Sequence, residues 1–324
     1  MTPPLIEAAG LTKHYAQRSG GWLRRPTQFL RAVDDVSLTI SRGETLGLVG
    51  ESGCGKSTFG RLLIRLLEPT AGRIRLNGTD ITELHGAALR EQRRAMQIIF
   101  QDPYGALNPR MSVEDIIAEP LIIHGARANA ATRREVARLL DLVGLPERAR
   151  ALFPHEFSGG QRQRIGIARA LILQPKLVVC DEPVSALDVS VQAQIVNLLS
   201  ELQRELGLTY LFIAHDLAVV KHISTRVAVM YLGKVVEVAD KSDLYATPLH
   251  PYTRMLIEAV PASHPRLRKR YCKQLTGDIP SALALPAGCR FHTRCPHAMP
   301  ICREQEPSFT NPAAGHGVAC HLTG

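Results

Sequence analysis

Gly50-Glu51-Ser52-Gly53-Cys54-Gly55-Lys56-Ser57-Thr58 fits the G-x-x-x-x-G-K-[ST] pattern of a phosphate loop. The apolar residues 45–49 before it predict a buried strand, and apolar residues at i, i+3, i+4 and i+7 from Phe59 predict a helix after it. A glycine loop at a helix N-terminus attracts anions through its backbone N–H groups and the helix dipole. We therefore expect a nucleoside triphosphate site, with Lys56 at the β- and γ-phosphates and Ser57 on Mg²⁺. A chance glycine-rich turn is the alternative, which the flanking strand and helix disfavour.

Composition narrows the class of protein. The chain has 324 residues, 45% of them hydrophobic, which is enough for one large domain and a small one. No apolar run reaches the roughly 18 residues of a membrane span, and the N-terminus lacks the pattern of a secretory signal. We therefore expect a cytosolic chain, in which seven cysteines favour thiol or metal chemistry over disulfides. The net charge of +9 permits an anionic partner, but the basic residues are dispersed and the densest run, 266–270, is expected to be solvated.

The order of the expected elements indicates an α/β protein with an inserted helical part. A short apolar strand is expected within 5–14, and strands of alternating polarity are expected at 32–40 and 72–78. Together they predict an antiparallel layer around the core. The polar stretch 16–31 is interpreted as an insertion or a hairpin at the edge of the domain. After a strand at 97–100, the periodicity is helical from 102 to about 170.

Polar residues stand where several predicted buried strands end. The strand 177–180 is followed by Asp181 and Glu182, and the strand 210–214 is followed by His215. A solvated turn is the alternative for the acidic pair, and a structural role is the alternative for the histidine.

Six motifs stand in the order found in the nucleotide-binding domains of ATP-binding-cassette (ABC) proteins, which this sequence resembles. They are the phosphate loop, Gln101, Ser158-Gly159-Gly160-Gln161, 177–182, 185–188 and His215. The resemblance implies a parallel phosphate-loop core, an antiparallel β layer and an inserted helical subdomain at about 102–170. It also implies a dimer that encloses two ATP molecules, in which residues 158–161 close on the nucleotide held by the other subunit.

The resemblance also implies a role for each motif. Residues 50–58 bind ATP, and Mg²⁺ is held by Ser57, Gln101 and Asp181. Glu182 polarises the attacking water, while Gln101 approaches that water. His215 contacts the γ-phosphate. Tyr15 is the candidate for stacking on adenine, with a core tyrosine as the alternative.

Four stretches resemble the ATPases of dipeptide and oligopeptide permeases, and the F-type subunit more closely than the D-type. They are 100–110, 183–192, 250–253 and 288–296. This resemblance implies an ATPase that energises peptide import from the cytoplasmic side of the inner membrane. Its implied partners are a D-type ATPase, two transmembrane permease subunits and, through them, a periplasmic or extracellular peptide-binding protein, with no nucleic acid. Glutathione or nickel is the alternative cargo. A soluble ABC ATPase is disfavoured because the chain has one cassette and no long heptad run.

The C-terminal part carries four spaced cysteines. We expect a nucleotide-binding domain at 1–245 and a small extension at 246–324 that contains Cys289, Cys295, Cys302 and Cys320. So few apolar residues accompany them that a metal staple is predicted. The spacing does not separate Zn²⁺ from an iron–sulfur centre, but the resemblance favours a [4Fe–4S] cluster, with four free thiols as a further alternative.

The other three cysteines fall outside this cluster. Cys54 and Cys180 are interpreted as packing residues, and Cys272 lies upstream of the four. Since the cluster lies outside every nucleotide motif, we expect it to serve stability or assembly rather than ATP chemistry.

Overall fold

The computed structural model describes residues 3–17, 28–259 and 280–323. These residues form two compact units. Of the described residues, unit 1 contains 3–5, 40–45 and 83–213, and unit 2 contains 6–17, 28–39, 46–82, 214–259 and 280–323. Most of the predicted insertion 16–31, the basic run 266–270 and Cys272 lie outside the described residues.

Unit 1 is built on three parallel strands. β7 (Leu177–Asp181) lies between β6 (Met96–Ile99) and β8 (Thr209–Ala214). Cys180 aligns with Ile99 on one side and with Phe212 on the other. β7 and β8 are buried along their whole length, which is why they are near-continuous apolar runs rather than alternating ones.

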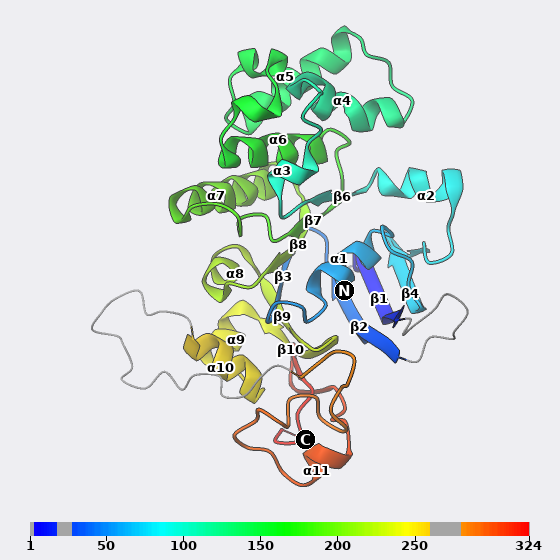
Figure 1. Ribbon diagram of the computed structural model, residues 1–324, viewed down its shortest axis with the longest axis vertical. Coiled ribbons are helices and arrows are strands. Elements are labelled where there is room, and N and C mark those ends of the chain that lie inside the picture. Colours follow the sequence, from blue (N-terminus) through cyan, green and yellow to red (C-terminus); the bar gives the residue numbers. More distant parts are fainter. Residues whose placement is uncertain (1–2, 18–27, 260–279, 324) are drawn as a thin grey trace. The chain divides into compact units, whose positions relative to one another are not determined.

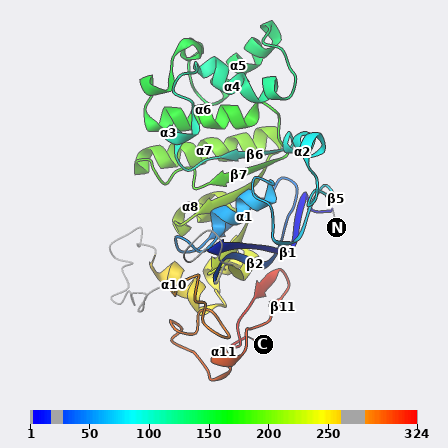
Figure 2. The same ribbon diagram turned by 45° about the vertical axis from the view of Figure 1, so that its right-hand side comes forward.

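The rest of unit 1 is mainly helical, as expected for 102 to about 170. Its helices are α2 (Gly86–Arg93), α3 (Pro103–Ala106), α4 (Val113–Ile123), α5 (Ala130–Leu142), the short η1 (Glu147–Ala151) and η2 (Pro154–Glu156), α6 (Gly159–Leu171) and α7 (Val189–Leu206). In Figures 1 and 2, α4, α5 and α6 gather beside one another. Ser112 caps α4 and Asn129 caps α5 with side-chain oxygens, which explains where these helices begin.

Unit 2 contains a mixed sheet with the strand order β3-β9-β10-β12-β11. β3 (Thr45–Val49) is parallel to β9 (Arg226–Tyr231), and β9 is antiparallel to β10 (Lys234–Asp240). β12 (His316–Val318) and β11 (Thr310–Ala313) extend the sheet beyond β10. Its helices are α1 (Lys56–Leu63), α8 (Leu217–Ile223), α9 (Lys241–Ala246), α10 (Pro251–Ala259) and α11 (Ile301–Glu304).

A second sheet of unit 2 is the expected antiparallel layer. Its order is β2 (Gln28–Ile40), β1 (Ile6–Gln17), β4 (Ala71–Leu76) and β5 (Thr79–Asp80). β1 pairs with β4 in antiparallel register. Both ends of the stretch 16–31 are strand, since β1 continues to Gln17 and β2 starts at Gln28.

The C-terminal segment 280–323 is held by a strand pairing and by a buried aromatic ring. β12 pairs with β10, and the Phe291 side chain is 1% exposed, with ring centres 5.3 Å from Tyr231 and 5.3 Å from Tyr252. From the sequence, the apolar residues of this segment are too few to hold it folded. The structure shows two further contributions, a buried aromatic cluster and a strand pairing.

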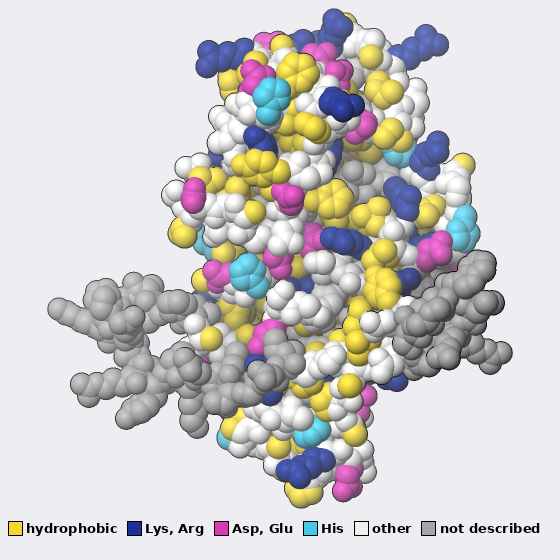
Figure 3. Space-filling view, viewed as in Figure 1, with side chains coloured by type: hydrophobic (Ala, Val, Ile, Leu, Met, Phe, Trp, Pro, Cys, Tyr) yellow, Lys and Arg dark blue, Asp and Glu magenta, His cyan; other side chains and the backbone are white. Residues whose placement is uncertain are grey.

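The described surface carries dispersed charge. On the face seen in Figure 3, Lys and Arg are interspersed with acidic and apolar side chains rather than gathered in one patch. Among the described residues, no helix combines the length and the apolar character needed to cross a membrane.

Phe291→Ala should lower the free energy of unfolding by about 3–5 kcal/mol, because it leaves a cavity in the aromatic cluster. Urea unfolding of the full chain measures this change. Phe29, which is 50% exposed on β2, provides the matched control, and Phe29→Ala should cost about 0.5 kcal/mol or less. Equal losses for the two variants would contradict the role given to Phe291.

Candidate active site

The phosphate loop connects β3 to α1 in unit 2 and fits closely against neighbouring backbone. A Cβ atom at Gly50 would lie 2.1 Å from the Met230 carbonyl oxygen, and one at Gly55 would lie 2.0 Å from the Ala32 carbonyl oxygen. Both glycines also have positive φ angles, 153° and 108°. Only glycine satisfies both conditions. α1 begins at Lys56 without an acidic residue in its first turn, which leaves the positive end of the helix dipole unopposed by a local carboxylate.

Lys56 lies inside the curve of this loop. Its side chain is buried, and its Nζ donates to the carbonyl oxygens of Gly50 at 2.7 Å and Glu51 at 3.0 Å. This arrangement keeps the ammonium group where the loop would bind phosphate. Cys54 is also buried, and burial raises the pKa of its thiol, in agreement with its predicted role as a packing residue.

Glu51 connects the loop to the C-terminal half of unit 2. Its carboxylate accepts two hydrogen bonds from Arg294, at 2.7 Å and 2.9 Å, and its N–H donates to the Tyr252 hydroxyl at 2.9 Å. Sequence reasoning missed Arg294 and Tyr252. The sequence does place a carboxylate, that of Glu51, inside an anion-binding loop, and such a carboxylate requires a cation nearby. The residues around Glu51 in the sequence do not identify which cation this is.

In unit 1, the structure brings Gln101 and Glu182 together. Asp181 ends β7 and is buried, and Glu182 follows it with a φ of 47°, which is unusual for a residue with a side chain. The Glu182 N–H donates to the Ile213 carbonyl at 3.1 Å, which ties this strained residue to β8. Gln101 Nε2 donates to Glu182 Oε2 at 2.9 Å. Strained backbone of this kind gathers at functional sites because the surrounding structure must hold it in place.

Residues 158–161 form the start of α6, also in unit 1. The exposed Ser158 caps the helix, and its N–H donates to Oε1 of Gln161 at 3.0 Å. A Cβ atom at Gly160 would lie 2.4 Å from Cγ1 of Val191 on α7, so glycine allows the close packing there. The result is an exposed helix N-terminus with small residues, which is suited to binding an anion.

His215 and Tyr15 both belong to unit 2. His215 is exposed between β8 and Asp216, which caps α8 by accepting from the Ala218 N–H at 2.7 Å. The Tyr15 side chain on β1 is 37% exposed, with Lys13 Nζ 5.3 Å from its ring centre. This exposure is compatible with a stacking surface, and it disfavours the alternative of a core tyrosine.

The four C-terminal cysteines are free and lie in one segment of unit 2. The Cys289 N–H donates to the Cys302 carbonyl at 2.8 Å. Burial raises the pKa of the Cys289 thiol to about 11, and the charges of Cys302, Cys320 and Cys295 act in the same direction. Across residues 3–17, 28–259 and 280–323, no group of three or more His, Cys, Asp or Glu is arranged to hold a metal ion.

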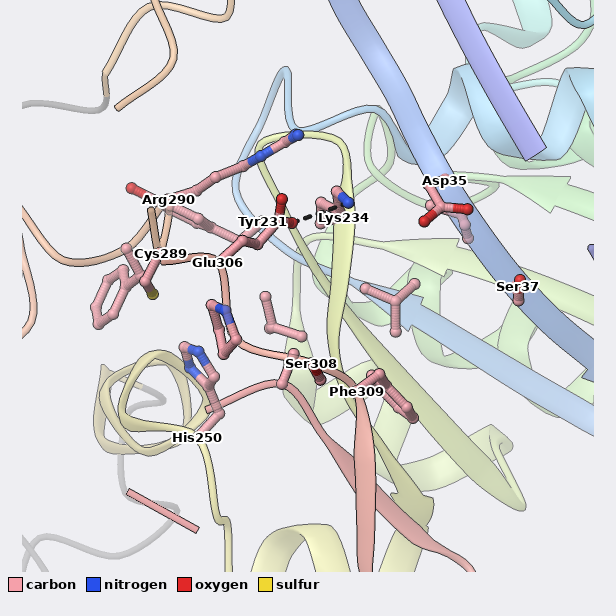
Figure 4. A pocket seen from close by; sticks show the side chains of 16 residues that line it. Asp35, Ser37, Tyr231, Lys234, His250, Cys289, Arg290, Glu306, Ser308 and Phe309 are labelled. Carbon is pink, nitrogen blue, oxygen red and sulfur yellow. Dashed lines mark ion pairs between the residues drawn. The ribbon is translucent and has the colours of Figure 1, made fainter. Parts of the chain in front are cut away.

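A cavity of about 430 Å³ lies between β2, β10 and the C-terminal segment (Figure 4). Its two cationic residues are already paired, Lys234 with Glu306 at 2.9 Å and Arg290 with Asp34. The Arg290 hydrogen bond and charge lower the pKa of the Asp34 carboxyl, although its burial acts in the opposite direction. Since both cations are already paired, neither is available to bind an anionic ligand. We therefore describe the cavity as space left where the C-terminal segment packs against β2 and β10.

Two protein-family models match the chain. The model described as "ABC transporter" matches residues 33–185. The model described as "Oligopeptide/dipeptide transporter, C-terminal region" matches residues 236–302.

Curated proteins are similar over nearly the whole chain. The oligopeptide transport ATP-binding protein AppF of Bacillus subtilis (strain 168) is 52% identical over 320 residues, which cover 98% of this chain and 97% of that protein. The probable peptide ABC transporter ATP-binding protein y4tS of Sinorhizobium fredii is 50% identical, covering 99% of this chain and 91% of that protein.

Solved structures are similar at the level of the cassette. The dimeric ATP-binding cassette MJ0796, in a post-hydrolysis state bound to ADP and Pi, has a TM-score of 0.64 and 29% identity, covering 73% of this chain and 98% of that chain. The structure of cbiO1 from Clostridium perfringens, part of the ABC transporter complex cbiONQ, has a TM-score of 0.64 and 26% identity, covering 75% of this chain and 91% of that chain.

Lys56→Ala should weaken ATP binding by about 10- to 100-fold, the range that corresponds to losing a charged hydrogen-bond donor. The dissociation constant of MgATP for the full chain is the measurement. Lys176→Ala, at an exposed lysine of unit 1, is the control and should leave the constant unchanged. ATP binding by Lys56→Ala at the unaltered affinity would rule out the phosphate loop as the ATP site.

Proposed function

This chain belongs to the ATPase subunits of oligopeptide and peptide ABC transporters, and from that premise we propose that it hydrolyses ATP at a site built from residues 50–58, Gln101, Asp181 and Glu182 to drive peptide import. The hydrogen bond from Gln101 to the carboxylate of Glu182 is the observation that supports the site most strongly. It joins two motifs that are far apart in the chain, at the end of a buried strand.

Phosphoryl transfer requires positioning and charge stabilisation more than covalent chemistry. Glu182 orients the attacking water or accepts a proton from it. Gln101 fixes the direction of the Glu182 carboxylate. Lys56 contributes positive charge beside the β- and γ-phosphates, and His215 contacts the γ-phosphate.

The donor set of the proposed site suits Mg²⁺, which prefers carboxylate, hydroxyl and amide oxygens. Ser57, Gln101 and Asp181 would hold it. When bound, Mg²⁺ neutralises charge on the phosphate oxygens. The position of Asp181 at the carboxyl end of the buried strand β7 supports this role, because ligands of α/β sheets bind beyond the carboxyl ends of the strands.

We propose that the working unit is a pair of ATPases. Residues 158–161 then act on the nucleotide of the other subunit, through the small residues at the exposed, Ser158-capped start of α6. The dimeric state of the cassette MJ0796 lends support by analogy. Tyr15 stacks on adenine in this proposal.

The proposed complex has a second, D-type ATPase, two transmembrane permease subunits and an extracytoplasmic peptide-binding protein. This chain would then lie at the cytoplasmic face of the membrane, with 1–245 as the nucleotide-binding domain and 246–324 as the extension. The helical part between 102 and 157 would receive a cytoplasmic helix of a membrane subunit. Gln101 lies at the entrance to this part, so ATP contacts and membrane-subunit contacts could move together.

Cys289, Cys295, Cys302 and Cys320 are proposed to hold a [4Fe–4S] cluster, with Zn²⁺ as the alternative. The donor chemistry fits, since all four are free thiols in one segment. In the structure their side chains are not arranged around one ion. Binding would therefore include local rearrangement and loss of the thiol protons.

Glu182→Gln should bind ATP normally but lower ATP hydrolysis by about 100-fold or more, because it removes the group that handles the proton of the attacking water. Peptide uptake should fall equally. The test purifies the complex from its native membrane through a tag on this chain, identifies the subunits by mass spectrometry, and measures hydrolysis and the uptake of defined peptides in vesicles. Glu201→Gln, at an exposed site on α7, is the control.

Three results would count against this proposal. Hydrolysis unaffected by Glu182→Gln would remove the catalytic assignment. Uptake of nickel or glutathione but not of peptides would change the cargo. A complex with this chain as its only ATPase would contradict the second, D-type ATPase.

Anaerobic purification should yield iron and sulfide in equal amounts with a broad visible absorbance, and Cys295→Ser should lose both. Cys272→Ser, outside the four cysteines, is the control. Stoichiometric zinc without iron would show that the site binds zinc and not an iron–sulfur cluster. A protein free of both metals would refute the proposal that a metal centre stabilises this segment.

A further inference from the structure

We propose that Arg294 is a positioning residue for the phosphate loop, so that the C-terminal segment sets the affinity for ATP. This inference rests on the proposed binding of the ATP phosphates by residues 50–58. Its basis is the paired hydrogen bonds from the Arg294 guanidinium to the Glu51 carboxylate, at 2.7 Å and 2.9 Å. The Arg294 side chain is only 3% exposed and that of Glu51 is 18% exposed.

Glu51 is held at three points, which leaves the start of the loop little freedom. Its N–H donates to the Tyr252 hydroxyl, its carbonyl accepts from Lys56, and its carboxylate accepts from Arg294. A loop that is already ordered loses less conformational entropy when it binds a ligand. Removing Arg294 releases one of the three points and should therefore weaken ATP binding.

Arg294 also compensates the charge of Glu51. A bare carboxylate in a loop that binds a polyphosphate would repel its ligand, most strongly in a site with little water. The Arg294 guanidinium carries its positive charge at every physiological pH, as arginine does in proteins. The fork of the Arg294 guanidinium binds both carboxylate oxygens of Glu51 at once, a geometry that lysine cannot reproduce.

The guanidinium is positioned in turn by buried aromatic rings. It lies 5.9 Å from the centre of the Tyr231 ring, and Tyr231 packs on Tyr252 with ring centres 4.7 Å apart. Phe291, three residues before Arg294, packs against both rings. One rigid cluster therefore holds the arginine and supplies the tyrosine hydroxyl that binds Glu51. Because all of these residues belong to unit 2, the connection runs within one compact body.

The experiment measures the dissociation constant of MgATP for the full chain in a Glu182→Gln background, which prevents turnover. Arg294→Ala should weaken binding about 10- to 100-fold, the usual range when a change at one site is coupled to binding at another. Arg294→Lys should give an intermediate loss. Glu51→Gln added to Arg294→Ala should recover part of the affinity, because it removes the uncompensated carboxylate.

Glu306→Gln is the matched control, since it breaks the ion pair of the same segment with Lys234 on β10, at 2.9 Å. It should leave ATP affinity unchanged. The melting temperature of each variant shows whether a loss of ATP affinity comes from a loss of stability. If Arg294→Ala does not fold, Arg294→Lys, with and without Glu51→Gln, replaces it in the test.

Unchanged affinity in Arg294→Ala and Arg294→Lys would overturn the proposal. The proposal would also be overturned if the loss of ATP affinity among the variants were proportional to their loss of melting temperature and Glu51→Gln restored none of it. That result would indicate a structural role alone. Lys56→Ala distinguishes the two proposals: if that variant binds ATP normally, the phosphate loop itself is not the ATP site.

Discussion

The close approach of backbone to the phosphate loop governs the arrangement of unit 2. The Met230 carbonyl on β9 occupies the place that a side chain at position 50 would need. The Ala32 carbonyl on β2 does the same for position 55, so both positions must be glycine. The loop can therefore keep its curve only if β9 and β2 stay in place, and β9 in turn pairs with β10 and β3. Binding of a polyphosphate by backbone N–H groups thus depends on the packing of two sheets rather than on nine residues alone.

The C-terminal segment belongs to the same packing. β12 extends the sheet next to β10, Phe291 fills the aromatic cluster, and Arg294 reaches Glu51. From sequence, the four cysteines were expected to act apart from ATP chemistry. Yet Cys295 directly follows the arginine that holds the phosphate loop, so a change in the conformation of this segment has a short physical route to the nucleotide site.

Much of the candidate site could be predicted because its signals are local. The glycine spacing of the phosphate loop, the apolar run before Asp181 and the capping residues at 158–161 each report a backbone geometry that neighbouring residues determine. Helical periodicity likewise identified the stretch from 102 to about 170. The Arg294–Glu51 pair could not be predicted, because its members lie 243 positions apart and only the folded sheet brings them together. The cysteine spacing left the metal open for a similar reason, since the thiol positions depend on how loops without a repeating pattern fold.

If the phosphate loop and the segment 289–302 form one cooperative body, ATP binding must stabilise both, and hydrogen exchange tests this most directly. Coupling between two sites is reciprocal, so a segment that stabilises ATP binding must itself be stabilised by ATP. Amide exchange of the full-length Glu182→Gln chain would be compared with and without MgATP. Slower exchange is expected with MgATP both at 50–58 and at 289–302 if the two segments form one body. Protection confined to 50–58, with exchange at 289–302 unchanged, would contradict it.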